Sequence, residues 1–210
     1  MPIRTVFLVD GFNLYHSVVD IARYCSGLNV RWLNISSLCG SYLHLIGKDA
    51  TTESIYYFSA LAYHLHDPDV ISRHETYIKC LRETGVKVQL SRFKPKTICC
   101  SHGGKITRHE EKETDVAIAS KMFEVLFNDE CNSVVLITGD TDLAPAVKTA
   151  RHLFPHKPIR FAFPYRRRND ELAQIASASF KIHKRSYIQH QFPDPFPLSD
   201  GTIISKPSGW

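Results

Sequence analysis

Two runs of apolar residues each end in aspartate. Asp10 follows the run at 3–9, and Asp140 and Asp142 follow the run at 134–138. In a sheet of parallel strands, ligands bind outside the carboxyl ends of the strands, so residues at those ends are the first candidates for chemistry. Carboxylates that meet there repel one another. A hard divalent cation such as Mg²⁺ or Mn²⁺ relieves that repulsion and keeps ligand positions for water and phosphate oxygens.

A further carboxylate is expected to join them from a helix. Asp115 lies in the first turn of a helix for which Thr114 is the expected N-cap, and two residues of the apolar stripe follow it four and seven positions later. Its side chain should therefore point toward the sheet. Taken singly, each aspartate also has an ordinary structural role, which is a turn for Asp10, a helix-terminal charge for Asp115 and a helix cap for Asp142. Their combination favours one metal site.

Strand-like and helix-like patterns alternate along the chain and must position these residues. Strands are predicted at 3–9, 54–61, 86–93, 134–138, 159–163 and, at an edge, 180–183. Helices are predicted at 11–24, 36–46 and 68–85, from 114, from 140 to about 153, and from 170. The polar segment 94–110 is predicted to be a long loop. This alternation indicates one α/β domain with a mainly parallel sheet.

The composition bounds the class of protein. The chain has 210 residues, of which 43% are hydrophobic and 22% charged, as expected of one globular domain. No apolar run approaches the roughly 20 residues of a membrane-spanning helix, so no membrane partner is expected. Six scattered cysteines without a secretory leader predict reduced thiols and a cytoplasmic location. The formal net charge of +5 is compatible with a polyanionic partner.

Four motifs together resemble the NYN-domain family of the PIN-like nuclease superfamily. The resemblance extends from about residue 3 to about residue 188, and the motifs lie at Asp10–Tyr15, Glu111–Val116, Thr138–Leu143 and Phe163–Arg168. It implies a three-layer α/β/α, Rossmann-like domain with a mainly parallel central sheet. We expect that domain at residues 1–190, followed by a Pro-rich C-terminal tail at 191–210.

The same resemblance implies a metal-dependent ribonuclease. In that family the matching carboxylates form the metal site, with an asparagine beside them; here these residues are Asp10, Asp115, Asp140, Asp142 and Asn13. Glu113 occupies a place where relatives often have glycine, and it either adds a carboxylate or faces solvent.

The expected mechanism is metal-assisted hydrolysis of a phosphodiester bond. A cation held by Asp10 and Asp140 would bind the scissile phosphate and stabilise its developing charge. The same ion, or a second held by Asp115 and Asp142, would lower the pKa of an attacking water. Asn13 would orient water or a phosphate oxygen. One metal and two metals both stay open, as do endonucleolytic and exonucleolytic cleavage.

A basic segment is predicted to bind the substrate. Arg166, Arg167 and Arg168 follow the strand at 159–163 and should emerge at the same sheet edge as the carboxylates. Arginine pairs with phosphate oxygens in two places, and Tyr165 could stack on an unpaired base of single-stranded RNA. The competing interpretation is a solvated turn capped by Asn169. A homodimer is left open by the sequence.

Other chemistries find less support. No P-loop, G-x-G-x-x-G or G-x-S-x-G motif is present, and Phe12 stands where an aspartyl phosphatase needs aspartate. Zinc at Cys99, Cys100, His102 and His109 is disfavoured because adjacent cysteines chelate poorly. The main alternative to a nuclease is a PIN-like module that binds RNA or a protein without cutting.

Overall fold

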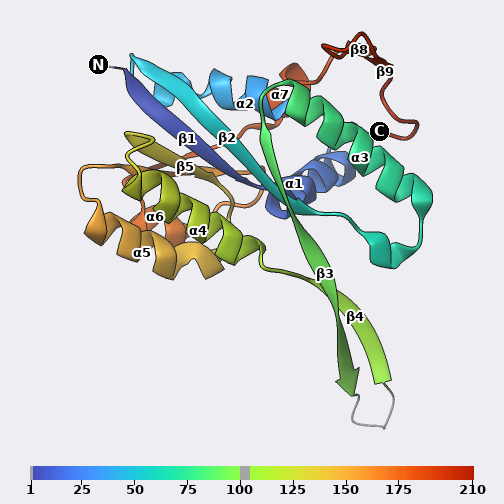
Figure 1. Cartoon of the computed structure of the whole chain (residues 1–210), viewed down its shortest axis with the longest axis horizontal. Coiled ribbons are helices and arrows are strands. Elements are labelled where there is room, and N and C mark those ends of the chain that lie inside the picture. The colour runs from blue at the N-terminus through green and yellow to red at the C-terminus, as the bar shows by residue number, and fades with distance from the viewer. Residues whose placement is uncertain (1, 100–104) are drawn as a thin grey trace.

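One sheet organises the molecule. The computed structural model describes the backbone of residues 2–99 and 105–210 and the side chains of 2–95 and 113–210. The sheet has the strand order β4-β3-β2-β1-β5-β6-β7 (Figure 1). Its strands are β1 (Ile3–Asp10), β2 (Ala50–Ala60), β3 (Lys87–Cys99), β4 (Lys105–Lys112), β5 (Ser133–Ile137), β6 (Ile159–Phe163) and β7 (Ala178–Lys181). All pair in parallel except β4, which is antiparallel to β3.

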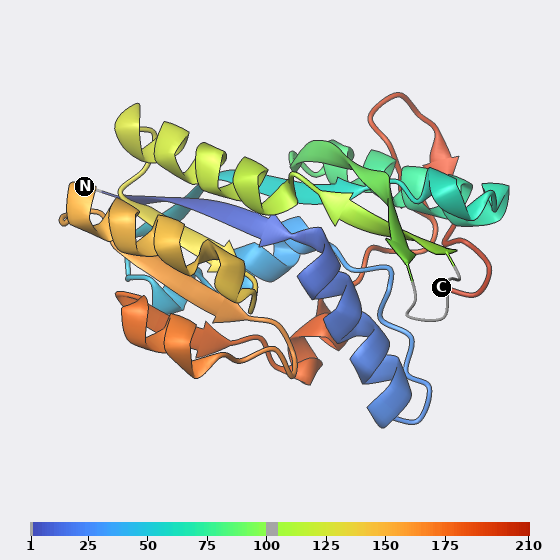
Figure 2. The ribbon, with the colours of Figure 1, turned by 90° about the horizontal axis from the view of Figure 1, so that it is seen from below.

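Helices cover both faces of this sheet. They are α1 (Gly11–Tyr24), α2 (Ile35–Ser41), α3 (Pro68–Glu83), α4 (Thr114–Phe127), α5 (Ala144–Leu153), α6 (Asp170–Ile175) and α7 (Lys184–Gln189). In Figure 2, α1 (blue) extends from the sheet on the side opposite to α4 (yellow-green). The three-layer α/β/α fold expected from the sequence is therefore confirmed.

The alternation of buried residues along β1 explains the two layers of core. Phe7 and Val9 pack into one cluster with residues of α1, α2 and α3, whereas Val6 and Leu8 pack into the other with residues of α4 and α5. Successive side chains of a strand point to opposite faces, so a central strand needs apolar residues at every position. This is why β1 and β5 form continuous apolar runs in the sequence.

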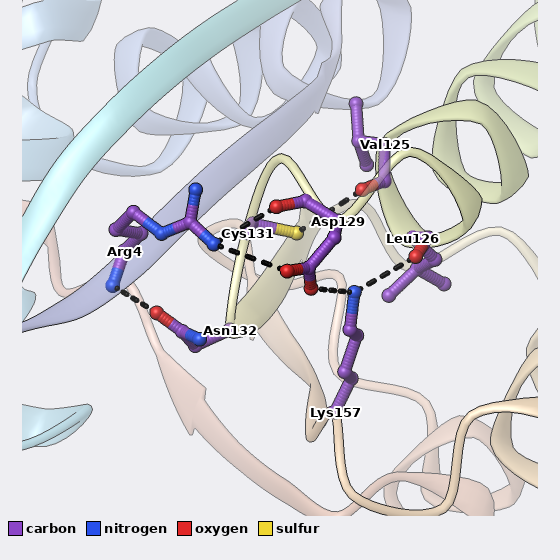
Figure 3. A network of polar contacts seen from close by, with 7 residues as sticks. All are labelled: Arg4, Val125, Leu126, Asp129, Cys131, Asn132 and Lys157. Carbon is purple, nitrogen blue, oxygen red and sulfur yellow. Dashed lines mark hydrogen bonds and ion pairs between the residues drawn. The ribbon is translucent and has the colours of Figure 1, made fainter.

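A network of polar contacts closes the amino edge of the sheet, opposite to the carboxylates (Figure 3). Asp129 pairs with Lys157 Nζ at 2.6 Å through its carboxylate and accepts a hydrogen bond from Arg4 Nη2 at its carbonyl at 2.8 Å. The Arg4 backbone N–H donates to Asn132 Oδ1 at 3.0 Å. The start of β1, the α4–β5 turn and the approach to β6 are thereby joined.

Residues 94–99 and 105–110 belong to two antiparallel strands, so the predicted long loop was wrong for these residues. β3 continues to Cys99 and β4 returns beside it, with Arg92 opposite Lys112 and Cys99 opposite Lys105. Figure 1 shows this hairpin extending away from the body of the molecule. An antiparallel ribbon can form from cross-strand hydrogen bonds without an apolar face, and its polar composition therefore concealed it. The zinc ligands considered at 99–109 lie outside the described side chains.

The helix predicted at 36–46 and the C-terminal segment also differ from the sequence prediction. The helix predicted at 36–46 is divided into α2 and a 3₁₀ turn, η1 (Leu43–Leu45). The C-terminal segment forms a small two-stranded sheet, β8 (Phe196–Pro197) with β9 (Ile203–Ile204). Phe192 and Phe196 are buried in the core cluster of α1–α3, and Trp210 packs against it. The Pro-rich segment is thus folded onto the domain.

Candidate metal centre

Asp10 is the most buried carboxylate at the carboxyl edge of the sheet. It ends β1 and caps α1, and it is 5% exposed. Its Oδ1 accepts the Asn13 N–H at 3.0 Å, and its Oδ2 accepts the Thr138 hydroxyl at 2.8 Å. Burial raises the pKa of Asp10, and these two donors act in the opposite direction.

The turn after β5 holds Asp140 through the same threonine. The Asp140 N–H donates to Thr138 Oγ1 at 3.0 Å, so that this hydroxyl joins two aspartates. Asp140 then caps a 3₁₀ turn, η3 (Thr141–Leu143), by accepting the Asp142 N–H at 3.1 Å. The Gly139 N–H donates to Asn13 Oδ1 at 3.0 Å. These contacts fix the β5 turn against the start of α1.

Three carboxylates meet at this edge. One oxygen from each of Asp10, Asp115 and Asp140 lies within 4.8 Å of the others. Asp115 comes from the first turn of α4, as its place before the apolar stripe predicted. Asp142 is exposed and outside this group of three, although its charge acts on Asp115.

The electrostatics of the cluster are those of an uncompensated acidic site. The pKa of Asp115 is raised to about 6, first by burial and then by the charges of Asp140, Asp10 and Asp142. Within the described side chains, no Lys, Arg or His forms an ion pair with the three clustered carboxylates. Hard oxygen ligands that repel one another fit Mg²⁺ or Mn²⁺. The residues present therefore suit a divalent cation.

Glu113 takes no part in this cluster. Its exposed carboxylate pairs with Lys94 Nζ at 2.6 Å and with Arg92 Nη2 at 3.5 Å on β3, and these cations lower its pKa. Glu113 has φ of 81°, in the left-handed region that favours glycine, and it occupies the N-cap of α4. The prediction of Thr114 as N-cap was wrong, because Thr114 is the first helical residue and is buried.

The predicted RNA-binding arginines all have partners within the chain. Arg167 Nη2 donates to Asp20 Oδ2 of α1 at 2.9 Å, and Arg168 Nε donates to Asp170 at 2.8 Å. The Arg166 guanidinium lies over the Tyr24 ring at 4.1 Å. Arg166 and Arg168 are exposed, whereas Arg167 is half-buried.

Tyr165 begins the turn that carries these arginines. Its ring is half-buried against the core, and its N–H donates to the Tyr187 hydroxyl at 3.1 Å. This turn also touches the carboxylate turn, because a Cβ on Gly139 would lie 2.0 Å from the Arg167 carbonyl oxygen. The basic segment therefore starts beside the acidic cluster.

Two structural residues of the site were not assigned from sequence. Thr138 joins Asp10 to Asp140. It could have been found from the sequence, because it ends an apolar strand directly before the acidic turn. Asp20 holds Arg167 across 147 positions of chain, and no local pattern marks such a contact.

The NYN domain family matches residues 4–177, a range that contains the whole cluster and the basic turn. The chain belongs to the NYN-domain family. The family resemblance seen in the sequence motifs is thereby confirmed. Among the described helices of this NYN-domain protein, none has the length and apolar character needed to cross a bilayer.

Two relatives of this NYN-domain protein are informative. It is 24% identical over 250 aligned residues to 6-hydroxy-3-succinoylpyridine 3-monooxygenase HspA of Pseudomonas putida (strain DSM 28022 / S16), which covers 100% of this chain and 76% of that protein. The crystal structure of a protein of unknown function from Vibrio parahaemolyticus is similar with a TM-score of 0.60. The two sequences are 17% identical, and the match covers 87% of this chain and 94% of the other. This similarity supports the fold assignment.

Proposed function

We propose that this protein is a metal-dependent ribonuclease that hydrolyses phosphodiester bonds of single-stranded RNA. The observation that carries the proposal is the meeting of Asp10, Asp115 and Asp140 within 4.8 Å, without a compensating cation among the described side chains, in a chain of the NYN family. The proposed metal ligands are these three aspartates together with Asp142. The proposed ion is Mg²⁺ or Mn²⁺, and it would stabilise charge on the phosphate and acidify a water.

The contacts of each residue support a distinct role. Asp10 is held by Asn13 and Thr138 and is the fixed ligand. Asp115 is half-buried and less constrained, which suits a ligand that adjusts to substrate. Asn13 Oδ1 is occupied by the Gly139 N–H, while its NH₂ group has no acceptor among the described residues. That NH₂ group is proposed to orient a water or a phosphate oxygen.

The proposed path of the RNA crosses the turn after β6. Arg166 and Arg168 are exposed, and their guanidinium groups can exchange a surface partner for phosphate at small cost, since exposed pairs contribute little stability. Arg167 is proposed to position the turn through Asp20 and to contact RNA with its remaining donors. Tyr165 is half-buried, and it is proposed to stack on a base with the part of its ring that solvent reaches. The single unpaired strand is the substrate that such a short basic turn can follow.

The alternative within the same family is a module that binds RNA or a protein without cutting. The nuclease and the RNA-binding module both predict RNA binding, whereas a protein-binding module does not. The proposals differ in whether the three clustered carboxylates bring about metal-dependent cleavage.

The decisive experiment is a cleavage assay with labelled single-stranded RNA and DNA in Mg²⁺, Mn²⁺ or EDTA. Wild-type protein should cut RNA only with a divalent cation, and Asp10→Asn and Asp140→Asn should reduce the rate by about a hundredfold or more. Asp49→Asn, an exposed aspartate far along the chain from the cluster, is the matched control and should cut normally. Cleavage by both cluster variants in EDTA would contradict the proposal, and binding without cleavage would favour the alternative.

A further inference from the structure

A cavity of about 500 Å³ lies between α1, α3 and the carboxyl end of β2, and none of the three clustered aspartates lines it. Residues of the C-terminal segment close one side of it. Its lining is mostly apolar and includes the aromatic residues Phe12, Tyr15, Tyr57, Tyr77, Phe93 and Trp210. A cavity of this size with rings on several sides has the dimensions of a small-molecule site.

Polar groups converge on this cavity from α3 and the loop before α2. Arg73 lines it and forms no hydrogen bond or ion pair with another residue in the described part of the chain. Arg31 lines it too and uses Nη1 to donate to the Gly209 carbonyl at 2.9 Å, which leaves its other donors. His74 stands one residue after Arg73 and lies 3.5 Å from the Ser59 hydroxyl. Two arginines that line one cavity favour an anionic ligand, because guanidinium groups form charge-assisted hydrogen bonds with carboxylate and phosphate.

The cavity wall includes the first residues of α1. Gly11 and Phe12, which directly follow Asp10, form part of its wall. A Cβ on Gly11 would lie 2.7 Å from the Tyr57 ring and 2.5 Å from the Phe58 carbonyl oxygen, so α1 and β2 are in close contact here. The start of α1 therefore contributes Gly11 and Phe12 to the cavity wall, and its cap Asp10 to the acidic cluster.

We propose that this cavity binds a planar aromatic ring carrying an anionic group, with the ring between the aromatic walls and the anion at Arg73 and Arg31. Rings stack well on aromatic side chains, and guanidinium groups pair with carboxylate and phosphate. Two sources supply this chemistry: a nucleotide of the RNA strand, and a free aromatic acid. The first source rests on the proposed function, whereas the cavity and its ligand chemistry do not.

The test measures binding by calorimetric titration to the full chain carrying Asp140→Asn, which impairs the metal site and leaves the cavity intact. The probes are uridine and adenosine 5′-monophosphate for the nucleotide source, and benzoate and pyridine-3-carboxylate for the free acid. At least one probe should bind. Adding Arg73→Met should weaken that probe about tenfold or more through loss of a charge-assisted contact, while adding Arg23→Met, an exposed arginine outside the cavity, should not.

A second variant tests the ring site without a change of charge. Val70→Phe adds bulk to the cavity wall and should weaken the same probe, with thermal unfolding confirming that the variant folds. Nucleotide binding together with a raised KM for RNA in Arg73→Met assigns the nucleotide source, and binding of the carboxylates alone assigns the free acid. The cavity proposal is overturned if no probe binds to the Asp140→Asn protein. It is also overturned if adding Arg73→Met leaves the affinity for the bound probe unchanged. Loss of RNA cleavage in the Asp140→Asn protein is measured separately and bears only on the nuclease.

Discussion

The hydroxyl of Thr138 is what allows Asp10 to be buried beside other carboxylates. A buried carboxylate loses its hydration and needs hydrogen bonds in exchange. Thr138 donates one such bond to Asp10 and accepts one from the Asp140 backbone, so the two aspartates are held close although they repel. One side chain thus links the carboxylate of Asp10 to the backbone of Asp140.

Asp115 should make the stability of the metal-free protein depend on pH. Its folded pKa of about 6 lies above the ordinary value of 3.8, so between these pH values the folded state retains a proton that the unfolded state releases. The free energy of unfolding should therefore fall as pH rises from 3.8 to about 6 and then level off. Urea unfolding in EDTA should show this fall in wild type and a weaker one in Asp115→Asn.

The same residue links pH to metal binding. Protons and cations compete for Asp115, so Mn²⁺ should stabilise the protein more at pH 7 than at pH 5. Asp49→Asn should behave as wild type in both measurements, because Asp49 is exposed and outside the cluster. A stability profile that is flat between pH 4 and 6 and identical in Asp115→Asn would contradict the assigned pKa.

For single residues, the sequence predicted the positions of the carboxylates better than the partners of the arginines. Asp10 and Asp140 end apolar strands, and parallel topology alone places their ends at one edge. Arg167 was predicted from charge and position, but its ion pair with Asp20 joins segments 147 residues apart. Glu113 was left open because its left-handed backbone, which turns it toward β3, has no sequence marker.

The turns after β5 and β6 act as one element because Gly139 lets them touch. Gly139→Ala would place a methyl group against the Arg167 carbonyl oxygen, a backbone atom that cannot turn aside. We expect a loss of about 1–3 kcal/mol in the free energy of unfolding, measured in urea. Gly40→Ala is the control, because nothing lies within 4 Å of its Cβ in α2, and it should stabilise by about 0.5–1 kcal/mol. Equal stability of the two variants would show that the turns are not packed together.

The basic turn should give RNA binding a measurable salt dependence. Arg166→Ala with Arg168→Ala should weaken RNA binding and reduce the slope of log affinity against log salt by roughly 0.7 per lost phosphate contact. Arg167→Met should instead lower stability, since it leaves Asp20, which is 18% exposed, without its partner. Binding titrations at several salt concentrations distinguish these effects. An unchanged slope in the double variant would remove the turn from the RNA path.

Elements buried on both faces were predictable, and elements outside the core were not. β1, β5 and β6 are short, mostly apolar runs, and a buried strand is the structure that such runs most readily form. The outer part of the β3–β4 hairpin has a mostly polar sequence, and most of the hairpin lies beyond the helices (Figure 1). Hydrophobic periodicity indicates burial, so it gives little information on a ribbon whose sequence is mostly polar.

The C-terminal segment packs into the core of the domain. Phe192 is 3% exposed and contacts Trp32, Tyr77 and Phe196 in the core cluster of α1–α3. Phe192→Ala should therefore lower the free energy of unfolding by about 3–5 kcal/mol. Ile203→Ala, at a side chain that is 67% exposed, should change it little. Urea unfolding of both variants tests this, and a neutral Phe192→Ala would mean that the segment is only loosely attached.

The central place of β1 in the sheet also affects folding during synthesis. β1 pairs with β2 on one side and β5 on the other, and Asp10 reaches Thr138 only across 128 positions of chain. Ribosomes add about 5–20 residues per second, so a newly made β1 waits about 6–25 seconds before its second neighbour exists. During that interval one edge of an apolar strand is open to wrong partners, which is the situation that chaperones relieve. The acidic cluster is assembled only after this wait, so the proposed metal site cannot form early on a nascent chain.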